Sequence, residues 1–325
     1  LGAGGWLAAS AILPRWSLAT PSEPPPSVFN VAGMPYAAFD RLASQRIEVA
    51  GGVIRLAYVP GAASGLPRES IAEWIRHCAS AVSTYYGRFP TPQTRLLIFS
   101  TGPSARAVRS GTTFAYGGAA IKLVLAESAT PALLERDWVL VHEMTHLAFP
   151  SVPSRHHWIE EGMATYVEPL ARAQAGRLEV EEVWRGMLKG MPNGLPEAGD
   201  RGLDRTPTWG RIYWGGALFA LLAEVGIRER TGNRKGLQQA LRAILERGNM
   251  EHDSELEPLL RIGDAAVGVP VLARLYASMK DRPHPVDLDA LWQRLGVRLD
   301  GDAVSFDDAA PLAAVRRAMT APPGA

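Results

Sequence analysis

The sequence predicts an α+β fold in which a small β-sheet lobe precedes a mainly helical lobe. Runs of β-branched and aromatic residues bounded by glycine and proline are concentrated before residue 127, which is the pattern of strands. After residue 130, apolar residues recur mostly with the spacing of helices. The chain has 325 residues, 47% of them apolar, enough for one large domain or two small ones. We therefore assign residues 28–130 to the β-rich lobe and 131–320 to the helical lobe.

The charge balance and the cysteine content exclude several classes of protein. The 34 basic residues against 33 acidic ones give a net charge of +1, so we expect no nucleic acid as a partner. The single cysteine, Cys78, cannot form an internal disulfide. Its place in an amphipathic helix predicts that it belongs to the core.

Residues 1–27 are interpreted as the remnant of an export signal followed by a proline-rich linker. The apolar stretch Trp6–Leu13 is too short to span a bilayer as a mature anchor, and Ser17–Ala19 offers small residues suited to cleavage. We therefore expect an exported protein, located in a bacterial periplasm, without a stable membrane anchor in the mature chain. The alternative is an ordinary apolar N-terminal arm.

The β-rich lobe should begin with a hairpin. Two strand-like runs within residues 45–59 are separated by Gly51 and Gly52. Residues 67–86 then read as an amphipathic helix that ends at Gly87, a residue suited to a left-handed C-cap. Strands are expected at 95–99 and at 114–126.

A buried helix follows, with the sequence His142-Glu143-Met144-Thr145-His146 inside an apolar run. Thr130 is expected to cap this helix, with Pro131 in its first turn, and Pro150 ends it. Residues four apart share one helix face, so the two imidazoles can bind one cation while Glu143 flanks it. Zinc suits two imidazoles and needs at least one more protein ligand.

The third ligand should come from the next helix, where Glu160 and Glu161 are adjacent carboxylates. Their spacing from the first helix does not choose between them. His156 and His157 precede them, and we expect both to be loop residues at the rim of the cleft, although ligand spacing excludes neither.

The pattern Trp158-x-x-Glu161-Gly162-x-Ala164-x-Tyr166 resembles the second signature of the gluzincin metallopeptidases, which include thermolysin-like and M1/M61 aminopeptidase-like enzymes. This resemblance implies a thermolysin-like gluzincin catalytic domain. It also implies that Glu161 is the third ligand of one Zn²⁺ ion. Gly162 would let the two helix backbones approach closely.

The resemblance assigns further roles. In this clan the strand before the zinc helix lies at the cleft edge and pairs with substrate, so Gly117 and Gly118 could let a peptide come close; the alternative is a simple bulge. The Gly-x-Met-Glu-Asn signature of M1 exopeptidases has no counterpart in this sequence. Aminopeptidase and endopeptidase action therefore both stay open.

Residues 190–210 are rich in glycine and proline and are predicted to be a long loop that could cover the cleft. The segment after it, 212–219, resembles the helix start that supplies a catalytic tyrosine in M1-like peptidases. The match falls on Tyr213, whose phenol would be a donor for an oxyanion; the alternative is a tyrosine packed in the core.

The rest of the chain is predicted to be helical, with a hairpin near its end. We expect Asp287 to be an N-cap and residues 297–306 to form a hairpin around Asp300 and Gly301. The expected helices are 234–247, 255–262, 269–280 and 287–295. The arginines expected to be solvated are Arg228, Arg230, Arg234 and Arg242.

Together these patterns predict a zinc-dependent peptidase acting on a peptide or protein substrate. Glu143 would be the general base and Tyr213 the oxyanion donor. Thr165 stands where thermolysin-like sites often have a carboxylate, so Glu168 and Asp137 are candidates to hold an imidazole N–H. The alternative function is a gluzincin-like protein that binds peptide or cell-wall material without cleaving it. The oligomeric state does not follow from the sequence.

Overall fold

The computed structural model describes residues 39–40, 42–59, 65–115 and 117–322. Residues 1–27, for which the sequence predicts an export signal and a linker, lie outside the described residues, so export to a periplasm stays a prediction. In the described part of the chain, no helix is both long enough and apolar enough to cross a membrane.

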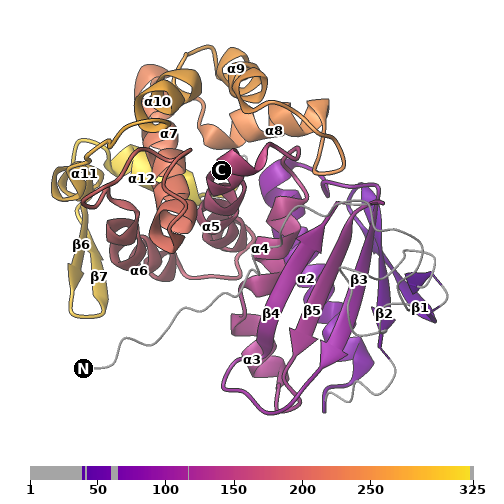
Figure 1. The fold of residues 1–325 in the computed structure, drawn as a ribbon. Helices are drawn as coiled ribbons and strands as arrows, with labels where there is room; N and C mark the ends of the chain where they lie inside the picture. Colours follow the sequence, from indigo (N-terminus) through magenta and orange to yellow (C-terminus); the bar gives the residue numbers. More distant parts are fainter. Residues whose placement is uncertain (1–38, 41, 60–64, 116, 323–325) are drawn as a thin grey trace.

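A twisted five-stranded sheet forms the first lobe, in the order β1-β2-β3-β5-β4 (Figure 1). The strands β2, β3 and β5 are parallel, whereas β1 and β4 run antiparallel to their neighbours at the two edges. The bounds are β1 Ser44–Val49, β2 Gly52–Tyr58, β3 Gln93–Ser100, β4 Val108–Phe114 and β5 Ala120–Leu125. The predicted hairpin and the predicted strand at 95–99 are thus confirmed.

The edge strand β4 differs from the expectation. The sequence predicted one strand over 114–126, but Phe114 ends β4 and the next strand begins at Ala120. The polar β4 sequence VRSGTTF lacks the apolar character of a central strand, because only one of its sides is paired. The edge strand on this side of the sheet is therefore β4, and not β5, which directly precedes the predicted metal-binding motif.

The helix α2 (Arg68–Tyr86) packs on one face of the sheet and confirms the predicted helix. It ends at Gly87, whose φ of 84° gives the left-handed C-cap expected there. Cys78 is buried in the core, as predicted. A smaller apolar cluster lies on the opposite face of the sheet, formed by Phe39, Ala57, Val59, Leu97 and Phe99.

The single helix predicted from Thr130 to Pro150 is broken into two. Thr130 caps α3 (Pro131–Arg136) through a hydrogen bond from the backbone N–H of Leu133, as expected. The chain then turns at Asp137, and α4 (Val139–His146) carries the metal-binding motif. Asp137 makes this break because its carboxylate accepts the backbone N–H of Val139, at 2.9 Å.

The second lobe is mainly helical and surrounds α5, which contacts both α4 and α7. Its helices are α5 His157–Gln174, α6 Val180–Gly190, α7 Gly216–Arg230, α8 Leu237–Arg247, α9 Leu256–Val267, α10 Leu272–Met279, α11 Leu288–Leu295 and α12 Ala313–Thr320. The four predicted later helices are present, Asp287 caps α11, and β6 (Val297–Asp300) pairs with β7 (Ala303–Phe306) as expected. The sequence did not single out α6 and α12.

The segment predicted as the loop 190–210 is more ordered than expected. It contains the 3₁₀ helix η3 (Met191–Gly194) and leads into the π-helical turn η4 (Gly210–Gly215). Asp200 of this segment forms a buried ion pair with Arg211 of η4, at 2.8 Å. The segment is therefore packed against the helical lobe.

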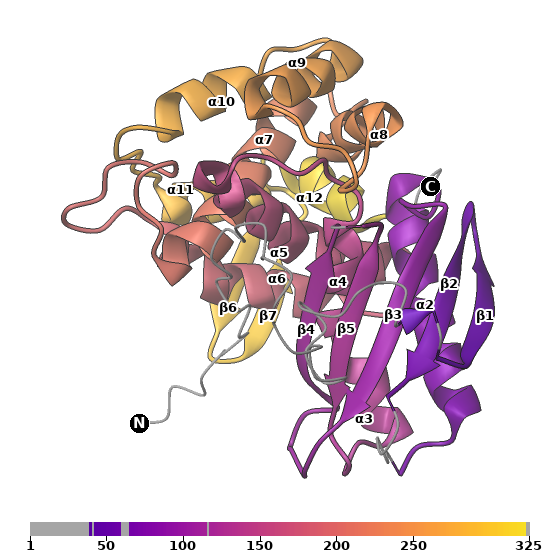
Figure 2. The same ribbon diagram turned by 45° about the vertical axis from the view of Figure 1, so that its right-hand side comes forward.

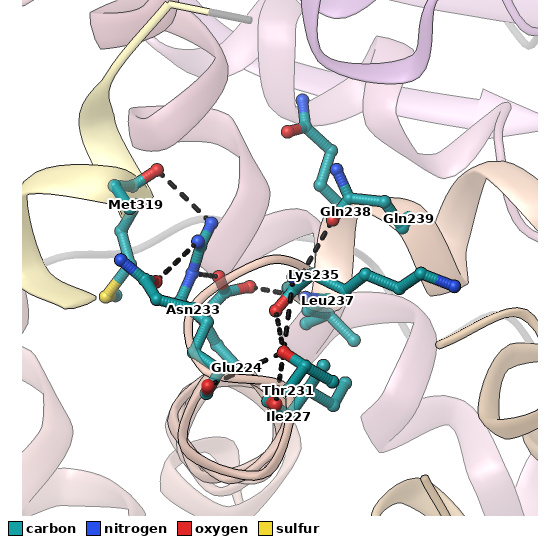
Figure 3. Close-up of polar contacts among 12 residues, drawn as sticks. Glu224, Ile227, Thr231, Asn233, Lys235, Leu237, Gln238, Gln239 and Met319 are labelled. Atoms are coloured by element: carbon teal, nitrogen blue, oxygen red, sulfur yellow. Dashed lines mark hydrogen bonds and ion pairs between the residues drawn. The ribbon is translucent and has the colours of Figure 1, made fainter. Parts of the chain in front are cut away.

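Arg228 is buried, contrary to the prediction that it is solvated. It pairs with Glu224 one turn earlier on α7 and donates hydrogen bonds to Asn233 and to the carbonyl oxygen of Ala318. The other carboxylate oxygen of Glu224 accepts the backbone N–H of Leu237 at the start of α8 (Figure 3). This cluster joins α7, α8 and α12, so Arg228 is a structural residue.

Candidate metal centre

Three predicted ligands converge between α4 and α5. The Nε2 atoms of His142 and His146 are 3.2 Å apart. Oε2 of Glu161 lies 3.3 Å from the first and 3.5 Å from the second. His142 and Glu161 are almost fully buried, at 4% and 3% exposure. The helices α4 and α5 are neighbours (Figures 1 and 2), and they present three donor atoms to one point.

The donor set fits a zinc ion. Zinc bonds to imidazole nitrogen and carboxylate oxygen are about 2.0–2.2 Å long, so a tetrahedral ion separates its donors by roughly 3.3–3.6 Å. The three distances between the donor atoms, 3.2, 3.3 and 3.5 Å, lie close to these values. Two imidazoles and one carboxylate are also the ligand types of known catalytic zinc sites.

The three groups are strongly coupled electrostatically. Burial lowers the pKa of His146, but the carboxylates of Glu161, Glu143 and Glu160 together outweigh burial and raise this pKa to about 9. Burial likewise raises the pKa of Glu161, whereas His146 and His142 hold it well below its usual range. A bound cation would compete with protons here, because metal-binding imidazoles are neutral.

Glu143 follows His142 on α4, and its side chain faces the edge strand β4. Its Oε2 accepts a hydrogen bond of 2.6 Å from the hydroxyl of Thr113. Gly111 makes room for it, because a Cβ atom at this glycine would lie 2.5 Å from Cγ of Glu143. Burial raises the pKa of Glu143, against the effect of His146, His142 and Thr113. The carboxylate is therefore held in a fixed position beside the three ligands.

The structure separates the two adjacent carboxylates of α5. Glu161 joins the metal ligands, whereas Glu160 accepts the backbone N–H of Val152 and lies 3.2 Å from Nδ1 of His157. A helix turns by about 100° per residue, so two adjacent side chains cannot point to the same centre. The choice of Glu161, which the sequence made by resemblance, agrees with this geometry.

His156 and His157 occupy different surroundings. His156 is not a rim residue as predicted: it is 2% exposed, and its Nδ1 lies 2.9 Å from Asp204, which also accepts hydrogen bonds from Trp158 and Tyr276. His157 is partly exposed and begins α5. Its Nε2 lies 3.4 Å from Oε1 of Glu161.

Neither candidate for holding an imidazole N–H is seen in that role. Both carboxylate oxygens of Asp137 accept backbone N–H groups, those of Val108 and Val139. Glu168 is buried and pairs with Arg172, at 2.9 Å. Glu168 still belongs to the electrostatic surroundings of the site, because His142 lowers its pKa while burial raises it.

Tyr213 lies on η4, close to the metal ligands. Its ring stacks on that of His142, with centroids 6.4 Å apart and an angle of 22° between the planes. The centroid of the Trp209 ring lies 6.1 Å from that of Tyr213. Tyr213 is only partly buried, and its role as an oxyanion donor stays a prediction.

The fold can be compared with solved structures. The chain matches an aminopeptidase N family protein from Idiomarina loihiensis with a TM-score of 0.57 and 13% identity, covering 79% of this chain and 49% of that one. It also matches an M1 zinc metallopeptidase from Deinococcus radiodurans, with 18% identity, coverage of 76% and 53%, and a TM-score of 0.46. No protein-family model and no curated protein sequence matches.

This chain has an M1 peptidase-like gluzincin fold. The predicted α+β catalytic-domain fold is thereby confirmed. The chain spans about half the length of the solved structures that it matches, and at these identities the similarity concerns the fold.

Within this gluzincin fold, Gly117 and Gly118 form the turn between β4 and β5. Both have positive φ angles, 73° and 107°, which glycine adopts without strain. A Cβ atom at Gly118 would meet Arg95 and Glu251. The glycine that lies against a site residue is instead Gly111, which the sequence analysis missed.

Proposed function

We propose that this chain is a zinc-dependent peptidase that holds one Zn²⁺ ion through His142, His146 and Glu161. The observation that carries the proposal is the convergence of two imidazole nitrogens and one carboxylate oxygen within 3.5 Å of one another. A second carboxylate, that of Glu143, is buried beside them. The M1 peptidase-like fold supports the same conclusion.

The roles of the side chains follow from their places. A zinc ion held by His142, His146 and Glu161 would lower the pKa of a water molecule to about 7. Glu143 would take the proton of the attacking water and pass it to the leaving amine. Thr113 holds the carboxylate of Glu143 in place through its 2.6 Å hydrogen bond. Tyr213 would donate a hydrogen bond to the carbonyl oxygen as it gains negative charge.

A peptide or protein substrate suits the position of β4. Within the described residues this strand pairs on one side only, with β5, and Glu143 lies against it. An extended peptide could add to its outer edge, which would place a backbone carbonyl beside the metal centre. Both exopeptidase and endopeptidase action are compatible with this arrangement.

The first prediction separates zinc binding from catalysis. Glu143→Gln should keep one zinc per chain and lower kcat/KM for peptide hydrolysis by roughly 10²–10⁴-fold, because it removes the base and none of the ligands. Metal analysis and a fluorogenic peptide assay measure the two effects. The matched control is Glu160→Gln, which changes the neighbouring carboxylate and should keep both zinc and activity.

Other outcomes would change the assignment. Full activity of the Glu143→Gln variant would remove Glu143 as the base. A wild-type protein without zinc would remove the metal site. A zinc-loaded wild type that binds peptides and hydrolyses none would establish the alternative, a binding protein with a gluzincin fold.

A further inference from the structure

A cavity of about 1000 Å³ opens beside the metal centre. It lies between the α3–α4 junction, α5, α6 and η4, and it shares His142 and Tyr213 with the site described above. Such a volume is at the upper end of ordinary ligand pockets. The cavity is larger than one amino-acid side chain, so a ligand of several residues could enter it.

Several aromatic side chains belong to the wall of this cavity. Trp138, Trp209, Trp214 and Tyr213 line it, together with Met187 from α6. In the described part of the chain, Trp209 is the exposed large hydrophobic residue, at 43% exposure. An exposed tryptophan on a cavity wall is costly in water and favourable in contact with an apolar ligand.

The charged residues of the cavity do not provide an obvious site for a charged ligand. The most buried of them, Glu168 and Arg172, neutralise each other at 2.9 Å. At the outer end, Glu135 and Arg177 are 3.8 Å apart and partly exposed. The wall therefore exposes more apolar than polar surface, and its most buried charges, Glu168 and Arg172, are paired.

We propose that this cavity, the aromatic pocket, binds the substrate side chain next to the scissile bond and selects bulky aromatic residues there. The inference rests on the proposed peptidase function. A substrate held between β4 and Tyr213 has the pocket beside it, because His142 belongs to both the ligand set and the pocket wall. Burying an aromatic side chain instead of alanine would favour that substrate by roughly 10- to 100-fold.

Gly186 provides a sharp test because it lines the pocket from α6. No atom lies within 4 Å of a Cβ atom built at this glycine, so the first atom of a larger side chain meets open space. Replacing a glycine inside a helix also favours the helix. Gly186→Leu should therefore keep the fold while it occupies part of the pocket. Glu181→Leu places the same side chain elsewhere on α6, outside the pocket lining.

The experiment measures kcat/KM for quenched peptides with free and blocked N-termini. The peptides carry Ala, Leu, Phe or Trp at one of the two positions that flank the cleaved bond. Mass spectrometry identifies the bond that is cleaved. On one side of the bond, the wild type should prefer Phe or Trp over Ala by about tenfold or more. Gly186→Leu should lower the Phe-to-Ala ratio at least about fivefold, and Glu181→Leu should leave it unchanged. Equal rates for Phe and Ala in the wild type, or a Gly186→Leu variant with an unaltered ratio, would overturn the proposal.

Binding without turnover separates this proposal from the proposed function. Isothermal titration of the zinc-loaded Glu143→Gln protein should show a Phe peptide binding at least about tenfold more tightly than its Ala analogue. Adding Gly186→Leu should remove most of that difference. If the wild type cleaves nothing while this preference is present, the peptidase fails and the pocket stands. If the Phe and Ala peptides bind equally, the aromatic pocket fails whatever the activity.

Discussion

Gly111 and Thr113 position Glu143 from the opposite side of the metal centre. They lie on β4, two residues apart, so both point to the same face of the strand. One leaves space for the carboxylate and the other donates a hydrogen bond to it. The proposed base is therefore held by the sheet, while the metal ligands are held by α4 and α5.

Gly111→Ala tests this positioning. A Cβ atom here would lie 2.5 Å from Cγ and 2.8 Å from Oε1 of Glu143, so the carboxylate must move. We expect kcat for peptide hydrolysis to fall roughly 10²-fold, because misplacing a catalytic group by about 1 Å has that effect. Zinc content should stay at one ion per chain, and KM should change little. An unchanged kcat would show that Glu143 tolerates displacement.

The ligands could be predicted from the sequence, but the residues around Glu143 could not. Helical periodicity places His142 and His146 on one face, and the resemblance around Gly162 selects Glu161 over Glu160. Gly111 and Thr113 carry no such signal. Their contacts with Glu143 join positions 30 or more residues apart, and the strand that holds them has no clear apolar alternation.

Gly162 brings two helices together at the level of the metal ligands. A Cβ atom on Gly162 would lie 2.3 Å from Cα of Gly216, the first residue of α7. The close approach predicted for this glycine thus exists, but it joins α5 to α7 and not the two ligand-bearing helices. It also sets the distance between Glu161 and η4, which carries Tyr213.

Gly162→Ala should therefore destabilise the protein by roughly 1–3 kcal/mol, because the backbones of α5 and α7 must separate. Chemical denaturation with a chelator present measures this effect apart from zinc binding. Gly186→Ala is the matched control: it also lies in a helix, meets no atom within 4 Å, and should be neutral or stabilising by up to about 1 kcal/mol. Equal effects of the two variants would contradict the close approach.

Asp137 connects the α3–α4 break to the start of β4. Burial raises its pKa from 3.8 to about 6, against two backbone hydrogen bonds that lower it. Because the folded pKa exceeds the unfolded one, its protonated form contributes stability below about pH 4, and this contribution is lost as pH rises through 6. The full change is equivalent to roughly 3 kcal/mol.

The difference in unfolding free energy between the wild type and Asp137→Asn should therefore decrease from pH 4 to pH 7. Asparagine does not ionise, so the variant lacks this pH dependence while it keeps one hydrogen-bond acceptor. Urea denaturation of both proteins at several pH values measures the difference. A difference that is constant or grows with pH would mean that Asp137 is ionised in the folded protein at pH 4.

Helices and strands could be predicted best from the sequence where one pattern of apolar residues continued along the whole element. The helix at 67–86 and the hairpin at 297–306 have clear patterns and clear end signals, Gly87 and Gly301. The sequence does not predict the break at Asp137, because the apolar run continues across it from Leu133 to Leu147. Asp137 breaks the helix through its bond to Val139, and its second bond, to Val108, involves a strand that the sequence did not predict.

In the whole molecule, the metal centre lies at the junction of the two lobes. Helix α4 packs against β4 and α2 of the sheet lobe, and α5 packs against α7 of the helical lobe. Two ligands come from α4 and one from α5. The sequence pattern predicts α4 and α5. The contact between them depends on how each lobe packs, which the sequence pattern does not predict.

A zinc ion at this junction should cross-link the lobes, so its removal should destabilise the whole protein. A ligand present at about 1000 times its Kd stabilises the folded protein by roughly 4 kcal/mol. For a domain of this size, removing the ligand should lower the unfolding midpoint by about 10 °C. Calorimetry with and without a chelator measures the shift. The Glu143→Gln variant should respond like the wild type, because it keeps all three ligands, and His146→Ala should not respond. A wild-type midpoint that stays constant while metal analysis shows zinc release would mean that the packing of α4 on α5 holds the lobes together without the ion.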